Sequence, residues 1–129
     1  MSVSVVTVDD QAVFRGVARE LIEATEGFEA VGEAESGEAA LAVVDQVRPQ
    51  LVLVDVRMPG MDGIETSQRI KEMHPSTVVV LISIEGASNI PSGAADCGAA
   101  VLVRKQDFGP AKLHDIWKLH GHPQPTETH

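Results

Sequence analysis

Five short runs rich in Val, Ile and Leu alternate along the chain with stretches that have helical periodicity. The runs extend over Val3 to Val8, Phe28 to Glu33, Leu51 to Val54, Thr77 to Ile82 and Ala100 to Val103. Residues of this kind favour strands, and fully apolar runs favour strands that are buried on both faces. Strict strand–helix alternation predicts an α/β fold, an open parallel sheet with helices on both faces. Leu51 to Val54 is apolar throughout, so we expect it at the centre.

The stretches between the runs contain apolar residues at the spacing of one helix face. In the first stretch these are Phe14, Val17, Ala18, Leu21 and Ile22; in the second they are Ala40, Leu41, Val44 and Val47. Ser36 is placed to cap the second helix. Asp62 is placed to cap a third, from Gly63 to about His74, which Pro75 ends.

The later part of the chain contains one weak segment and one further helix. Gly86 to Gly98 is interrupted by Pro and Gly, so we expect only a short helix from near Pro91. Pro110 suits the first turn of the last helix, where Leu113, Ile116 and Trp117 share a face. We expect one domain over residues 1–120 and a disordered tail over 121–129.

Charge and composition restrict the classes of function. The 129 residues carry a net charge of -9, which disfavours direct binding of nucleic acid. The single cysteine, Cys97, excludes an internal disulfide and is typical of a small buried residue. No apolar run is long enough to span a bilayer, and the first residues do not resemble a signal peptide. We therefore expect a cytoplasmic protein without membrane contacts.

Chemically active side chains follow four of the five predicted strands. Asp9 and Asp10 follow the first, Asp55 the third, Ser83 the fourth, and Lys105 follows the fifth after one residue. In open α/β sheets, ligands bind beyond the carboxyl ends of the strands. We therefore expect these side chains to meet at one edge of the sheet.

Three carboxylates in one small site require either protonation or a bound cation. Oxygen ligands favour Mg²⁺, which also accepts phosphate oxygens. A carboxylate such as Asp55 can act as a nucleophile and form an acyl phosphate. Lys105 and Ser83 can then bind the phosphoryl oxygens. Taken singly, each of these residues is as well explained by a turn, a cap or a strand end.

Four segments together resemble the receiver domain of bacterial two-component response regulators, over roughly residues 3 to 119. They are VDD, LVLVDVRMPGMDG, LIS and GAAVLVRK. The resemblance implies a flavodoxin-like doubly wound sheet of order 2-1-3-4-5. It implies that Asp55 is the phosphoacceptor, that Ser83 and Lys105 contact the phosphoryl group, and that Mg²⁺ is a cofactor. It implies that the metal ligands are Asp9, Asp10, Asp55 and the backbone carbonyl of Arg57.

The same resemblance implies a role in signalling. The phosphoryl donor would be a sensor histidine kinase or a phosphotransfer protein, and phosphorylation would switch a protein–protein interface. Such a domain is not an enzyme beyond catalysing its own phosphorylation and dephosphorylation. The segment DDQAVFRGVARELIE resembles receivers whose output is a helix-turn-helix domain. In that subfamily Trp117 would lie near a homodimer contact of the first and last helices, instead of packing only in the core.

Some positions differ from the family pattern. Leu102 stands where many members have an aromatic residue, and Gln106 stands where many have proline. Arg57 and Glu85 should flank the mouth of the site, and we expect them to pair across it and to impede the hydrolytic water.

Three other functions remain open from the sequence. An aspartyl-phosphate hydrolase of the haloacid-dehalogenase type would need an acid at position 57, which is Arg57, and a longer chain. A flavin carrier would need a phosphate-binding loop where Asp9 and Asp10 stand. A degenerate receiver would act as an interaction module without phosphorylation.

Overall fold

The computed structural model describes residues 2–84 and 93–121, and the statements below concern these residues. The strands are β1 (Val3–Val8), β2 (Phe28–Ala34), β3 (Leu51–Asp55), β4 (Val78–Ser83) and β5 (Val101–Arg104). The helices are α1 (Ala12–Glu23), α2 (Gly37–Val47), α3 (Gly63–Met73) and α4 (Pro110–His120), with short 3₁₀ turns η2 (Ala94–Asp96) and η3 (Lys105–Asp107). No helix of the described part is both long and apolar enough to cross a bilayer.

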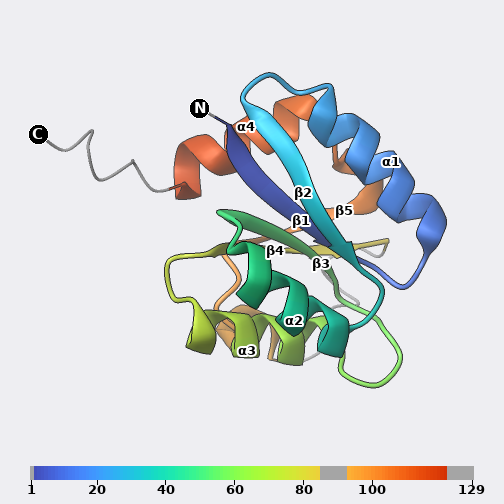
Figure 1. Ribbon diagram of the computed structural model, residues 1–129, viewed down its shortest axis with the longest axis vertical. Coiled ribbons are helices and arrows are strands. Elements are labelled where there is room, and N and C mark those ends of the chain that lie inside the picture. The colour runs from blue at the N-terminus through green and yellow to red at the C-terminus, as the bar shows by residue number, and fades with distance from the viewer. Residues whose placement is uncertain (1, 85–92, 122–129) are drawn as a thin grey trace, which may run out of the picture.

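The strands form one parallel sheet in the order β2-β1-β3-β4-β5, which confirms the predicted fold class (Figure 1). Every residue of β3 is buried, as expected for the central strand. The carboxyl ends of the strands are in register, because Val8 pairs with Val54, Asp55 with Ile82, and Ser83 with Arg104. The polar residues that follow these strands are therefore brought to the same edge.

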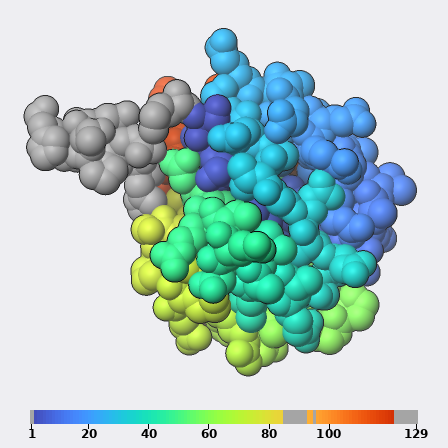
Figure 2. All heavy atoms as spheres, viewed as in Figure 1, coloured from blue at the N-terminus to red at the C-terminus, as the bar shows by residue number. Residues whose placement is uncertain are grey.

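The helices cover the sheet in two layers (Figure 1). α2 and α3 lie on one face and α1 and α4 on the other. Each layer has its own apolar core: Val6, Val54 and Val44 belong to the first, whereas Val5 and Leu53 belong to the second. In the view of Figure 2, atoms of α1, β2, α2 and α3 form one continuous surface. The two helix layers of Figure 1 thus cover the two faces of the sheet.

Local signals account for three of the four helix starts in the described part. The Ser36 side chain accepts a hydrogen bond from the Ala39 amide at 3.1 Å, and Asp62 accepts one from the Glu65 amide at 2.9 Å, so both predicted caps are confirmed. Pro110 is the first residue of α4, as predicted. These caps satisfy amides that the first helical turn leaves without partners.

The helix periodicity was wrong for two valines. Val17 on α1 is 47% exposed and Val47 at the end of α2 is 39% exposed, although both were predicted to lie on the apolar face of their helix. Val47 is the last residue of its helix, and the chain turns away at Arg48, which has a φ of 47°. Trp117 is partly buried against the core of the α1–α4 layer, and Cys97 is buried as predicted.

Several strand boundaries differ from the prediction by one residue, since apolar content does not mark the last backbone hydrogen bond. The start that we predict for a short helix, near Pro91, falls within residues 85–92, which lie outside the described part. The described residues that follow form only the 3₁₀ turn η2. Residues 122–129 also lie outside the described part, so the domain boundary at 120 and the disordered tail stay predictions.

Candidate functional site

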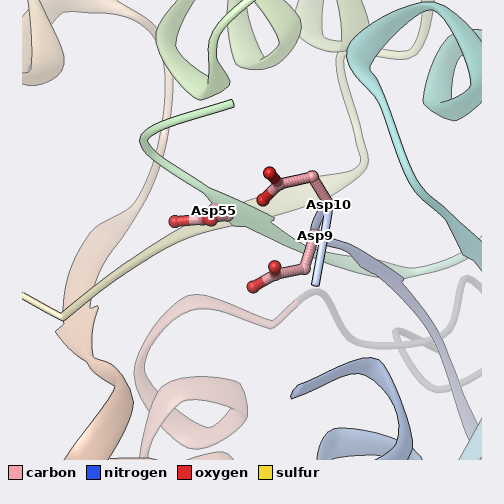
Figure 3. A group of neighbouring side chains, drawn as sticks. All are labelled: Asp9, Asp10 and Asp55. Carbon is pink, nitrogen blue, oxygen red and sulfur yellow. The ribbon is translucent and has the colours of Figure 1, made fainter. Parts of the chain in front are cut away.

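Three carboxylates converge at the carboxyl edge of the sheet. Asp9 and Asp10 follow β1, and Asp55 is the last residue of β3. One oxygen from each lies within 4.8 Å of the other two, and Figure 3 shows the three side chains extending to the same side. Asp9 is completely buried, Asp55 is 8% exposed, and Asp10 is exposed. The site therefore opens to solvent through Asp10.

Lys105 places its ammonium beside two of these carboxylates. Its Nζ atom lies 2.7 Å from Asp9 Oδ2 and 3.7 Å from Asp55 Oδ2. The side chain is only 13% exposed, and Nζ stands 4.5 Å from the centre of the Phe14 ring. The aromatic face attracts the cation and shields it from water. Lys105 thus supplies one positive charge to a site that contains three acids.

The electrostatics of the site raise the pKa of Asp55 from 3.8 to about 6. Burial is the largest cause, and the negative charge of Asp9 is the next. Lys105 and the Arg57 amide oppose the rise, and Asp10 adds to it. At neutral pH Asp55 is therefore mostly ionised, but the ionised form is held in an unfavourable environment that a further positive charge would relieve.

Backbone contacts fix the geometry around the acids. The Gln11 amide donates to Asp9 Oδ1 at 2.8 Å, and the Arg57 amide donates to Asp55 Oδ1 at 3.4 Å. Gly63 begins α3 so close to the end of β3 that a Cβ atom there would overlap the Asp55 carbonyl oxygen. The glycine that follows Asp62 is therefore required by packing against the site.

The other predicted site residues are placed less completely. Ser83 ends β4 one residue beyond the partner of Asp55 and is 3% exposed, and it has further interactions within the structure. Arg57 is exposed and also has a further interaction within the structure. Glu85, its expected partner, lies outside the described residues. The roles of Ser83 and of the Arg57 carbonyl stay predictions.

Two contacts of the site were missed by the sequence analysis. Phe14 was assigned to the core, but its ring also contacts the Lys105 ammonium. Arg15 was not considered, yet its Nη1 atom donates to the Asp9 carbonyl oxygen at 2.6 Å. The signal for Arg15 was its position in the first turn and a half of a helix that starts at the acidic pair, since side chains there point back toward the helix start.

The donor set fits a hard divalent cation. All three grouped side chains offer carboxylate oxygens, which are ligands that Mg²⁺ prefers. Oδ2 of Asp9 is buried and receives no aligned hydrogen bond, although the Lys105 ammonium is close to it. Burial of a carboxylate oxygen is costly unless positive charge lies beside it, and a bound cation would add to the charge of Lys105. Asp9, Asp10 and Asp55 are therefore the residues that would hold one.

Comparisons with known proteins agree with this geometry. Residues 5–118 match the response regulator receiver domain family. The chain is 38% identical over 106 residues to a protein-glutamate methylesterase/protein-glutamine glutaminase of Thiobacillus denitrificans, covering 81% of this chain and 30% of that protein. It is 35% identical over 104 residues to response regulator GacA of Pseudomonas protegens, covering 80% of this chain and 48% of that protein. The chain thus spans less than half the length of either relative.

Solved structures show the same fold. The signal receiver domain of the putative response regulator NarL from Mycobacterium tuberculosis superposes with a TM-score of 0.80 at 32% identity, covering 91% of this chain and 97% of that domain. The structural neighbours also include a LuxR-family response regulator from Aurantimonas sp., at 25% identity and a TM-score of 0.82, which covers 99% of this chain and 94% of that chain. With its sheet order, its three-acid pocket and a match over residues 5–118, the chain belongs to the response regulator receiver domain family.

Proposed function

We propose that this domain is the phosphoacceptor of a two-component system and that it takes a phosphoryl group on Asp55. The observation that carries the proposal is the Lys105 ammonium, which lies 3.7 Å from Asp55 Oδ2 at the edge of the three-acid pocket. Phosphoryl transfer demands positioning and positive charge more than covalent chemistry from the protein. This pocket offers a nucleophile, a fixed cation and acids that can hold a second cation.

In the proposed reaction, a carboxylate oxygen of Asp55 attacks the phosphorus atom of a phosphohistidine donor. The phosphorus–nitrogen bond breaks, the histidine leaves, and an acyl phosphate remains on Asp55. Lys105 neutralises one developing negative charge, and the Ser83 hydroxyl, at the end of β4, donates to another phosphoryl oxygen. In a separate step of dephosphorylation, water attacks the phosphorus atom. The bond between phosphorus and the Asp55 oxygen breaks, inorganic phosphate leaves, and the carboxylate is restored.

Asp9, Asp10, Asp55 and the Arg57 carbonyl are the proposed ligands of Mg²⁺. When bound, Mg²⁺ would supply positive charge to the phosphoryl oxygens in addition to that of Lys105. The pKa of Asp55, raised to about 6, supports this assignment, because an ionised carboxylate beside Asp9 lacks sufficient compensation from Lys105 alone. The metal would relieve that repulsion and leave the Asp55 carboxylate ionised for attack.

The wider role follows from the same chemistry. Receiver domains pair with histidine kinases, so the donor is a sensor histidine kinase or a phosphotransfer protein in the cytoplasm. A phosphoryl group on Asp55 would draw Lys105 and Ser83, the residues at the ends of β5 and β4, into new contacts. Those shifts would bias a protein–protein interface between two states. The domain would then act as a switch whose only catalysis is its own phosphorylation and dephosphorylation.

Incubation with acetyl phosphate and Mg²⁺, followed by intact mass spectrometry, tests the assignment. We expect one phosphoryl adduct in the natural protein and none in Asp55→Asn or in the presence of a chelator. Asp62→Asn is a matched control: it changes another aspartate near the site, whose role as a helix cap asparagine can fill. An adduct that persists in Asp55→Asn, or no adduct in the natural protein, would overturn the proposal.

A further inference from the structure

Arg15 reaches back from α1 to the end of β1. Its guanidinium Nη1 donates to the main-chain oxygen of Asp9 at 2.6 Å, and its side chain is only 18% exposed. The amide of Asp9 in turn donates to the Ala34 oxygen of β2 at 3.0 Å. The backbone of Asp9 is therefore held on one side by the sheet and on the other by Arg15.

Glu33 lies beside Arg15 and Arg19. Its Oε1 atom lies 3.7 Å from Arg15 Nε, and its Oε2 atom lies 2.8 Å from the Nε of Arg19. A guanidinium has five donors in a rigid plane, so one group can serve a carbonyl and a carboxylate together. Ion pairs at the surface contribute little to stability, so we expect this arrangement to act by fixing the position of the Arg15 side chain. It ties the end of β2 to the carbonyl of Asp9.

The carbonyl that Arg15 binds belongs to the peptide group that joins Asp9 to Asp10. Asp10 is exposed, and the next residue, Gln11, precedes α1 without a side-chain capping bond. The contacts of Asp9 therefore limit where the Asp10 carboxylate can stand. We propose that Arg15, oriented by Glu33, is a positioning residue that sets the Asp9–Asp10 peptide for cation binding. This inference rests on the proposed Mg²⁺ site.

The charge of Arg15 and its positioning role have opposite expected effects on Mg²⁺ affinity, so a substitution can distinguish them. A positive charge near a cation site repels the cation, so removing it should by itself strengthen Mg²⁺ binding. Losing the orientation of the peptide should instead weaken binding, as the loss of groups that support metal ligands does by about 10- to 100-fold. A weaker site in an Arg15 variant would therefore come from lost geometry.

Calorimetric titration with MgCl₂ of the full chain and its variants is the test. We expect Arg15→Gln to bind Mg²⁺ about 10-fold more weakly, and Arg15→Lys, which can still donate to the carbonyl, to recover most of the affinity. Arg19→Gln removes a charge of the same sign that contacts Glu33, so its affinity should not fall. In metal-free protein, the Gln11 amide, which donates to Asp9 Oδ1, should exchange faster in Arg15→Gln.

The outcomes separate this inference from the proposed function. If the natural protein binds Mg²⁺ and Arg15→Gln binds it as tightly or more tightly, the inference is overturned while the metal site stands. If the natural protein itself does not bind Mg²⁺, both fail. If Arg15→Gln does not fold, Arg15→Lys is the deciding variant. Normal exchange of the Gln11 amide together with near-normal Mg²⁺ affinity supports the inference. Normal exchange of that amide together with at least about a 10-fold loss of Mg²⁺ affinity overturns it.

Discussion

Replacing Asp55 by asparagine should stabilise the metal-free protein at neutral pH. The substitution keeps the size of the side chain and removes its charge. Burial and the neighbouring Asp9 raise the pKa of Asp55 from 3.8 to about 6, so the folded state holds the proton more tightly than the unfolded state. The ionised form therefore opposes folding, and this penalty grows as the pH rises from about 4 through 6.

The magnitude follows from the pKa. Each tenfold change in an acid constant corresponds to about 1.4 kcal/mol, so a pKa of about 6 gives a penalty of about 3 kcal/mol at pH 7.5 and about 0.5 kcal/mol at pH 4. Because Asp55 is only 8% exposed, solvent screening removes little of it. We expect the variant to exceed the natural protein in unfolding free energy by about these amounts.

Urea denaturation with a chelator present measures this difference. The single tryptophan, Trp117, lies partly buried on α4 and reports unfolding by fluorescence far from the substitution. Added Mg²⁺ should reduce this difference in unfolding free energy, since it stabilises only a protein that binds it and we expect the natural protein to bind it. Asp62→Asn should leave the free energy unchanged. If the two proteins have the same unfolding free energy at pH 7.5, or differ by the same amount at pH 4 and pH 7.5, the reasoning about buried charge is refuted.

Two further substitutions test the contacts around Asp55. Lys105→Met should raise the pKa of Asp55 above about 6, because the ammonium lowers that pKa. Carboxyl NMR titration measures it, and Lys118→Met, a change of an exposed lysine, should leave it unaltered. An unaltered Asp55 titration in Lys105→Met would contradict the ion pair. Gly63→Ala should reduce the free energy of unfolding by about 3 kcal/mol through overlap with the Asp55 carbonyl. Gly16→Ala in helix α1, where the new Cβ would make only an ordinary contact with Arg19 at 3.7 Å, should instead increase the free energy of unfolding by up to about 1 kcal/mol. Equal effects of the two substitutions would contradict the overlap.

The sheet and the meeting of the acids could be predicted because both depend on simple periodicity. A strand that is buried on both faces must be largely apolar, and the first four residues of β3 are. Parallel strands end at one edge, so Asp9, Asp55 and Lys105 had to come together once the alternation was recognised. The exposure of Val17 shows the limit of that method, since helical spacing does not tell how much of a face its neighbours cover.

The division of charge within the site could not be predicted in this way, because it depends on differences of about one ångström. Lys105 stands 2.7 Å from Asp9 and 3.7 Å from Asp55, so in the unmodified protein its nearest acid is the one that we do not assign as phosphoacceptor. A phosphoryl group would extend from Asp55 and carry more negative charge than the carboxylate it replaces. Lys105 would then have the stronger attraction on the Asp55 side, and its contacts with Asp9 and the Phe14 ring would weaken. The same lysine that lowers the pKa of Asp55 before transfer would thus change partners after it, which gives the predicted switch a physical cause.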